Sequence, residues 1–316
     1  MKVNSVLVAT DLSEAADPIY RVAVDLAGRL GARATLLHVN EVEELRLPAS
    51  SAGTAARWRQ VLREVAEQET ARLELARAAF EEAGIPVETI TVSNNPTVEI
   101  CEIARERDID LVVLGRRGAR RLKGNGVGRT TRQVLRRSRV PVLVVPDTDG
   151  RPGVVLGRLT AGTNFTPNCA AGLRETLELA SDLDVAVDVV HVTRLPVPFA
   201  LGPDTWRELF PEESLAESRA SLALHIEEAV GETLARFCNP IAVWGTSVAE
   251  TLRDVVRSSG SGLVAVPARG ARPNGLLGTS TENVLKLSPV PVLVFPAAYL
   301  GRNGGAHGWG VTSSGA

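Results

Sequence analysis

The sequence predicts an α/β protein made of two tandem, doubly wound parallel sheets of five strands each, paired about a pseudo-two-fold axis. Two observations carry this prediction. The segment VPVLVVP at Val140–Pro146 returns as VPVLVFP at Val290–Pro296, 150 positions later. In each half, short aliphatic runs alternate with longer segments of helical periodicity, the order that gives parallel strands joined by helical crossovers.

Further anchors of the repeat occur in the same order. LLHV, ending at Val39, returns as VVHV, ending at Val192. RRGAR at Arg116–Arg120 returns as ARGAR at Ala268–Arg272, and VLVATDLS (6–13) corresponds to RLTAGTNFT (158–166). A duplicated domain is therefore expected, with a linker in the Pro-, Asp- and Gly-rich stretch at 146–153. The expected divisions are a first domain at 1–147, a second, more divergent domain at 153–297 and a flexible tail at 298–316.

In the first half, the run Ser5–Ala9 predicts a buried parallel strand, and Ser13–Gly31 predicts a helix with one apolar stripe. A second strand is expected at Ala34–Val39, and a long charged helix at Ala55–Ala83 follows it. The remaining strands and helices are expected at Val87–Val92, Thr97–Arg107, Leu111–Leu114, Gly128–Arg137 and Val142–Val145.

The second half predicts the same order of elements. Strands are expected at 154–162, 185–192, 241–244, 263–266 and 292–295. Helices are expected between them at 167–182, 214–237, 247–258 and 279–287.

Composition limits the kind of protein. The 316 residues are 44% hydrophobic and 4% aromatic, with a net charge of −2, so the chain as a whole is not a polyanion binder. Three scattered cysteines disfavour a disulfide framework or a metal site. A basic run at 116–139 contains no aromatic residue, so nucleic-acid binding is not expected. A cytoplasmic protein without membrane insertion is expected, because no signal-peptide pattern or run of 18 apolar residues occurs.

Candidate ligand groups follow the carboxyl ends of the predicted strands, where open parallel sheets bind ligands. In the first half these groups are Thr10–Asp11, Val39–Asn40 and the loop from Gly115 to Gly128. Asp11 and Ser13 could equally cap the following helix. His38 and His191 end equivalent strands and are expected to be buried and hydrogen-bonded. The apolar segment 194–214 is expected to pack on its own domain, with a cover over the cleft as the alternative.

The loop glycines favour phosphate binding. Gly115 is expected to let a ligand approach the strand end, and Gly118 to supply a turn with positive φ. Gly128 is expected to open a helix whose unpaired N–H groups face an anion, while Thr130 and Thr131 add hydroxyls. The loop is no Walker motif, because Gly124 and Asn125 follow Lys123, and a solvated connection stays the alternative.

These residues resemble the universal stress protein family in its tandem two-domain form, over residues 3–297. The family's nucleotide-binding members carry Gly-x2-Gly-x9-Gly-Ser/Thr after the fourth strand, and the three loop glycines match this spacing. The resemblance implies a Rossmann-like fold of the adenine nucleotide α-hydrolase type, and ATP as ligand, with or without Mg²⁺. Asp11 and Val39 would then contact the adenine and ribose. The full candidate set is Thr10, Asp11, Val39, Gly115, Gly118, Gly128, Arg129 and Thr130.

The sequence departs from the family pattern in both halves. Arg129 stands where the family has Ser or Thr, and it could pair with phosphate or fold into the site and block it. In the second half, Asn164 replaces the aspartate and Pro267 replaces the first glycine. The second-half candidates are Asn164, Val192, Gly270, Gly278, Thr279 and Ser280.

The resemblance implies a stress-response sensor or regulator that binds ATP or a related adenine nucleotide. No general base is evident near the loop, so at most slow hydrolysis is expected. A nucleotide-free interaction module of the same fold and a transfer enzyme of the wider α-hydrolase class stay open. The aliphatic runs at Val140–Pro146 and Val290–Pro296 are edge-strand candidates that pair the halves within one chain. Two chains are then expected to pair again as a homodimer.

Overall fold

The computed structural model describes residues 1–40, 52–118, 126–147, 156–194, 215–268 and 277–303. The strands of the first half are β1 (Ser5–Thr10), β2 (Arg33–Asn40), β3 (Val87–Ser93), β4 (Leu111–Gly115) and β5 (Val142–Val145). Its helices are η1 (Glu14–Ala16), α1 (Asp17–Leu30), α2 (Ala52–Glu82), α3 (Pro96–Glu106) and α4 (Arg129–Arg137).

The second half repeats this order. Its strands are β6 (Arg158–Thr163), β7 (Ala186–Arg194), β8 (Cys238–Gly245), β9 (Leu263–Pro267) and β10 (Val292–Phe295). Its helices are α5 (Pro167–Leu183), α7 (Leu215–Val230), α8 (Glu232–Ala235), α9 (Val248–Ser259), α10 (Thr279–Leu287) and α11 (Ala297–Asn303).

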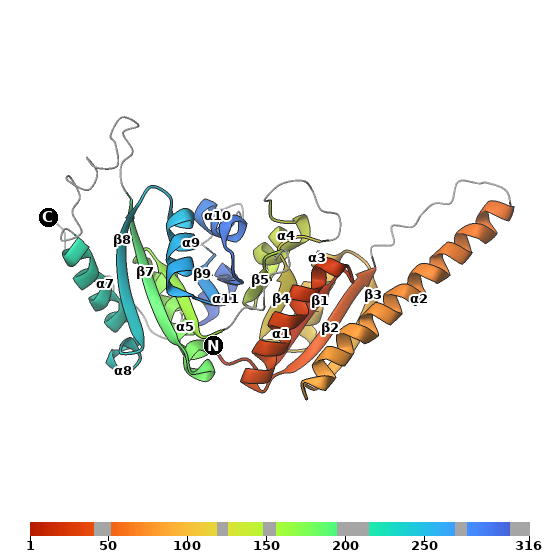
Figure 1. The fold of residues 1–316 in the computed structure, drawn as a ribbon, viewed down its shortest axis with the longest axis horizontal. Coiled ribbons are helices and arrows are strands. Elements are labelled where there is room, and N and C mark those ends of the chain that lie inside the picture. Colours follow the sequence, from red (N-terminus) through yellow and green to blue (C-terminus); the bar gives the residue numbers. More distant parts are fainter. Residues whose placement is uncertain (41–51, 119–125, 148–155, 195–214, 269–276, 304–316) are drawn as a thin grey trace.

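The two halves form one ten-stranded sheet in the order β3-β2-β1-β4-β5-β10-β9-β6-β7-β8 (Figure 1). Neighbouring strands within each half are parallel, whereas β5 and β10 are antiparallel, with Leu143 opposite Leu293. The predicted pairing of the two aliphatic runs is therefore confirmed. Because the two joining strands are antiparallel, the halves are related by a pseudo-two-fold axis.

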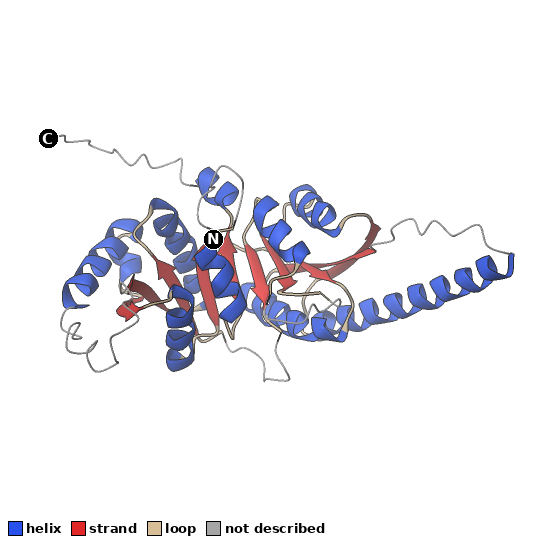
Figure 2. Cartoon of the chain, turned by 90° about the horizontal axis from the view of Figure 1, so that it is seen from above, coloured by secondary structure: helices blue, strands red, loops and turns tan. Residues whose placement is uncertain are grey.

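Helices cover both faces of the sheet, as a doubly wound fold requires (Figure 2). One core cluster joins the sheet to α1, α2, α5, α7 and α11, and includes the fully buried Phe80 and Phe295. The other joins it to α3, α4, α9 and α10. The strands are aliphatic on both faces because both faces are covered.

Two predicted helices differ from the structure for local reasons. The helix expected from Ser13 begins as the 3-10 turn η1, and α1 starts at Asp17, with Pro18 in its first turn. The helix expected over 214–237 is broken at Gly231, whose φ of 78° ends α7 before α8 begins.

The tail expected at 298–316 does not begin as an unstructured segment. Residues Ala297–Asn303 form α11, because Leu300 is buried and the Tyr299 ring stacks on Phe295 at 6.2 Å. The Tyr299 hydroxyl also donates a 2.7 Å hydrogen bond to Glu175 Oε2 on α5. The remainder of the expected tail, 304–316, lies outside the described residues.

Buried charges fasten the two halves beside the β5–β10 joint. The Arg116 side chain is 9% exposed; its Nη1 donates to the carbonyl of Lys286 on α10 at 2.8 Å, and its Nη2 to Asp147 Oδ2 at 3.2 Å. Arg117 Nε donates to the same carboxylate oxygen at 2.5 Å. Across the axis, Arg132 of α4 pairs with Glu282 of α10 at 3.1 Å. Two loop arginines that the sequence places beside Gly115 thus serve the joint.

Asp147→Ala should destabilise the protein by about 3 kcal/mol, because it leaves the buried Arg116 guanidinium without its counter-charge. Urea denaturation monitored by circular dichroism measures the loss. Glu106→Ala is the matched control, since it removes a carboxylate whose partner Arg105 is 63% exposed, and should cost no more than about 0.5 kcal/mol. Equal losses in the two variants would contradict the assignment of Asp147 to the joint.

Candidate functional site

A strained turn follows β1. Leu12 has a φ of 56°, a left-handed conformation that is unfavourable for a leucine, and its N–H donates to Thr10 Oγ1 at 3.0 Å. Asp11 Oδ1 accepts hydrogen bonds from the Ser13 N–H at 3.1 Å and from the Ser13 hydroxyl at 2.7 Å. Ser13 itself makes no side-chain cap to η1. Asp11 therefore organises the turn, and the alternative that Asp11 or Ser13 caps the following helix is wrong, because neither side chain caps η1 or α1.

The second half builds the same turn from a different sequence. Phe165 has a φ of 61°, and its N–H donates to Thr163 Oγ1 at 3.4 Å. Asn164 Oδ1 accepts from the Thr166 N–H at 3.3 Å and from the Thr166 hydroxyl at 2.7 Å. Each such left-handed residue costs about 1–3 kcal/mol, and its presence at corresponding places in both halves shows that the turn is a shared feature of the fold.

A histidine near the C-terminal end of β2 supports this turn. His38 is buried; its Nδ1 lies 3.1 Å from the Thr10 carbonyl oxygen and its Nε2 lies 2.8 Å from Asn40 Oδ1. His191 contacts the Thr163 carbonyl oxygen in the same way, at 3.1 Å, but it is only half-buried. The prediction of hydrogen-bonded strand histidines is confirmed for both, and burial only for His38. Val39, next along β2, is half-buried at the carboxyl edge of the sheet.

The loop after β4 comes back to Asp11. A Cβ added to Gly118 would lie 3.0 Å from Asp11 Oδ2, so only a glycine lets the loop approach the carboxylate this closely. The structure thus brings together two candidate residues that are far apart in the sequence. The predicted positive φ at Gly118 is wrong, because the left-handed glycines of the described chain lie elsewhere. Space, not backbone conformation, requires the glycine.

Gly115 has a packing role that the sequence did not reveal. A Cβ there would lie 3.0 Å from Ile19 Cδ1 on α1 and 3.1 Å from the Arg117 carbonyl oxygen. The contact with α1 is therefore one reason for a glycine here, and the predicted approach of a ligand to this strand end stays a prediction.

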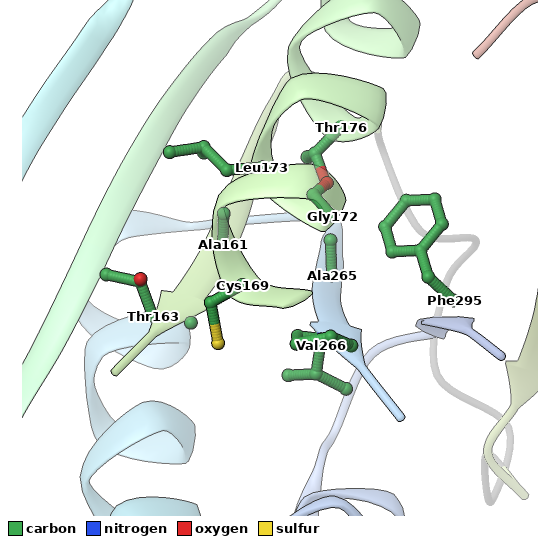
Figure 3. Close-up of a pocket in the computed structure, with 11 residues that line it drawn as sticks. Ala161, Thr163, Cys169, Gly172, Leu173, Thr176, Ala265, Val266 and Phe295 are labelled. Carbon is green, nitrogen blue, oxygen red and sulfur yellow. The ribbon is translucent and has the colours of Figure 1, made fainter. Parts of the chain in front are cut away.

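The second half exchanges the two partners. Pro267 stands at the end of β9 in place of Gly115, and Gly172 stands on α5 in place of Ile19, with Pro267 Cβ 3.6 Å from a Cβ added to Gly172. Figure 3 shows Gly172 facing the ring of Phe295. In the first half the larger residue is on the helix and the glycine on the strand. In the second half the glycine is on the helix and the larger residue on the strand. Pro267 is explained by packing and says nothing against a ligand.

A small cavity remains beside Gly172, between α5 and the ends of β6 and β9 (Figure 3). It measures about 10 Å³, room for about one water molecule. A nucleotide does not fit there. Its lining includes Thr163, Cys169, Gly172, Val266 and Phe295.

The N-terminus of α4 has no side-chain cap. Gly128 precedes it, and no side chain of the described residues accepts from its first turn. Helix α3 differs, because Asn95 Oδ1 accepts from the N–H groups of Thr97 at 3.0 Å and Val98 at 3.4 Å. The first-turn donors of α4 are therefore available to an external anion, whereas those of α3 are partly satisfied.

The residues that open α4 differ in what they can do. Arg129 is exposed and makes no hydrogen bond or ion pair within the described part of the chain, so it does not fold onto Asp11. Thr130 is half-buried. Thr131 is buried, and its hydroxyl donates to the Gly115 carbonyl at 2.8 Å, so the prediction that it offers a hydroxyl to the ligand is wrong.

The second-half candidates are only partly assembled. Gly270 lies outside the described residues, while Gly278 opens α10 without a side-chain cap, and Thr279 and Ser280 follow it. Val192 is 9% exposed. Asn164 Oδ1 also accepts a hydrogen bond from the Cys169 thiol at 2.8 Å, so this oxygen has three hydrogen-bond donors.

An aromatic cluster stands over the second turn. The Phe165 ring lies 4.3 Å from the His191 ring and 5.0 Å from the His225 ring, measured between centroids. Burial lowers the pKa of His225, so this ring is neutral at physiological pH. The segment 195–214, expected to pack on its domain or cover the cleft, lies outside the described residues.

Three residues that shape the turn were not predicted from the sequence. Leu12 carries the strained backbone, Tyr20 bonds the Thr10 hydroxyl, and Arg72 of α2 donates to the Leu12 carbonyl at 2.8 Å. Arg72 corresponds to His225 in the repeat, since both follow their turn residue by 60 positions. This shared spacing of 60 positions could have indicated from the sequence that the two residues occupy equivalent places.

The described residues give little support for metal binding, cysteine chemistry or a membrane-spanning helix. They contain no group of three or more His, Cys, Asp or Glu side chains placed to hold a metal ion. Cys101, Cys169 and Cys238 are free, and burial raises the pKa of the Cys238 thiol to about 12. None of the helices described is long and apolar enough to cross a membrane.

The fold and the strand-end site define a two-domain α/β protein of the Rossmann-like class. A sequence profile of the universal stress protein family matches residues 2–146 and again residues 157–296. The chain belongs to this family, with two of its domains in tandem.

Individual proteins show the same likeness. Universal stress protein YxiE of Bacillus subtilis is 32% identical over 146 residues, 45% of this chain and 98% of that protein. Universal stress protein MJ0577 of Methanocaldococcus jannaschii is 27% identical over 152 residues, 45% of this chain and 94% of that protein. A crystal structure of a universal stress protein from Archaeoglobus fulgidus covers 94% of this chain and all of its own, with a TM-score of 0.67 at 20% identity, and so shows the fold.

The exchange at Gly115 can be tested with a double-mutant cycle. Gly115→Ala should cost about 2 kcal/mol of stability, because its Cβ crowds Ile19 Cδ1. Ile19→Val removes that atom and should cost about 1 kcal/mol alone. The double variant should be about 1 kcal/mol more stable than the sum of the single losses, measured by urea denaturation. Strict additivity would contradict the contact.

Proposed function

We propose that this chain is a stress-response sensor or regulator, acting in the cytoplasm, that binds ATP or a related adenine nucleotide through its first half. One observation carries the proposal. Asp11 and Gly118 meet at the carboxyl end of the sheet, next to the uncapped N-terminus of α4. An acceptor for hydroxyl groups and a set of phosphate donors are thus side by side, which is what a nucleotide requires.

The residues fit the nucleotide in charge as well as in position. Asp11 would accept a ribose hydroxyl, with Thr10 holding the turn and Val39 lying against the adenine. The phosphates would bind the first-turn N–H groups of α4, the backbone at Gly118 and the Thr130 hydroxyl, beside Gly128, whose own N–H donates to the Arg116 carbonyl at 2.8 Å. Mg²⁺, when bound with ATP, would neutralise part of the phosphate charge. No acidic residue stands in the first turn of α4 to repel the phosphates.

Arg129 takes part in this proposal as a phosphate ligand. Its side chain is exposed and unpaired within the described residues, so its guanidinium is available for a bidentate contact. Arg116 and Arg117 are different, because Asp147 engages both of them. Arg116 and Arg117 thus stabilise the joint, whereas Arg129 is available to the ligand.

We infer binding rather than fast catalysis. His38 is the residue near the turn whose side chain could act as a general base, but oxygen atoms lie within 3.1 Å of both of its ring nitrogens. Hydrolysis needs a group that takes a proton from water, and an imidazole engaged on both sides does this poorly. Slow ATP hydrolysis at most is therefore part of the proposal.

For the second half we propose an interaction role without nucleotide. Asn164 lacks the negative charge, and its oxygen already has three donors. Glu282 stands in the first turn of α10, where it opposes a phosphate. The exposed Phe165 ring favours a contact surface.

Gly118→Ala should weaken ATP binding at least tenfold in isothermal titration calorimetry, because its Cβ would crowd Asp11 Oδ2 where the ligand binds. Gly126→Ala is the matched control: it lies in the same loop, nothing stands within 4 Å of its added Cβ, and affinity should be unchanged. Both variants should unfold at the wild-type temperature. Unchanged affinity in Gly118→Ala would refute the proposed site.

Arg129→Ser should weaken ATP binding about tenfold and leave adenosine binding unchanged, since a charge-assisted pair is worth about 1.5 kcal/mol. Parallel titrations with ATP and adenosine separate a phosphate contact from a change in the fold. Tighter ATP binding would mean instead that Arg129 obstructs the site.

A further inference from the structure

We propose that two copies of this chain associate through the N-terminal half of α2, with the two helices antiparallel. Helix α2 has 31 residues and is therefore about 46 Å long. Figures 1 and 2 show that it reaches well beyond the sheet, while its C-terminal end lies against β2 and β3. The projecting half has no neighbour among the described residues.

The projecting half carries an apolar face that is solvent-exposed in the described part of the chain. In the docked half, Leu73, Ala76 and Phe80 are buried against the core. Val65 and Leu62 continue that stripe at helical spacing, yet they are 44% and 42% exposed, and Val61 is 39% exposed beside them. Exposure of these apolar side chains to water costs free energy, and packing against a second apolar helix would remove this cost.

The charges on α2 favour a second copy of the same helix, in antiparallel orientation, as the partner of the apolar stripe. Arg57 and Glu64 are seven residues apart, so both stand on the same edge of the apolar stripe, and both are exposed. Antiparallel pairing of two copies brings Arg57 of each beside Glu64 of the other. Parallel pairing would set Arg57 level with Arg57 and Glu64 level with Glu64, which is unfavourable. The helix is therefore complementary to a reversed copy of itself.

The geometry also limits the overlap. With the two-fold axis between Gln60 and Val61, Arg57 of one copy is level with Glu64 of the other, and residue 52 faces residue 69. The overlap then spans the projecting half and ends just before Leu73, where α2 meets its own domain. This arrangement places the bodies of the two chains at opposite ends of the helix pair. A contact of this length is small, so the dimer should depend on concentration.

Analytical ultracentrifugation of the full chain over a range of concentrations tests the proposal. The wild type should shift from monomer to dimer, and Leu62→Glu with Val65→Glu should keep it monomeric. Leu75→Glu is the control: this leucine is 74% exposed on the same helix but lies outside the overlap, so the dimer should persist. A wild type that stays monomeric, or a dimer that survives the double variant, would overturn the proposal.

A charge exchange tests the direction. Arg57→Glu alone and Glu64→Arg alone should each raise the dimer dissociation constant several-fold, and the two together should restore it. Circular dichroism confirms that the helix is intact in each variant. Failure of the combined variant to recover would exclude the antiparallel pairing, and so would dissociation in Leu75→Glu to the same extent as in the double variant.

Discussion

The antiparallel pairing of β5 with β10 is the interaction on which the rest of the structure depends. It turns two five-stranded sheets into one and buries the aliphatic strand of each half that would otherwise be an exposed edge. It also sets α4 beside α10, so that Arg132 reaches Glu282 and Arg116 reaches the carbonyl of Lys286. The loop that leads to Gly118 and Gly128 begins at Arg116, and the joint therefore anchors one end of the candidate site.

The two halves serve as controls for each other. Both keep the strained turn, the histidine near the end of the neighbouring strand and an uncapped helix after the fourth strand. These shared features belong to the fold. They differ where a ligand would bind: Asp11 has a charge that Asn164 lacks, and the first turn of α4 has no acid, whereas that of α10 has Glu282. The difference supports nucleotide binding by one half only.

The sequence predicted the strands, their pairing and the meeting of Asp11 with the glycine loop, because the repeat and the strand-end rule need only local pattern. It could not predict why Gly115 is a glycine, since the reason is a contact with Ile19 from another element. It also could not divide the arginines: Arg116 and Arg129 look alike in sequence, and only the fold buries one against Asp147 and exposes the other. Helix α11 was missed because its packing includes a hydrogen bond from Tyr299 to Glu175 of α5, 124 positions away in the sequence.

The central claim is that one half of the chain binds nucleotide and the other does not. Native mass spectrometry of the full chain with saturating ATP and Mg²⁺ tests this most directly, because it counts ligands per chain without assuming a site. One nucleotide is expected for each chain, in monomer and dimer alike. Two nucleotides for each chain, or none, would contradict the claim.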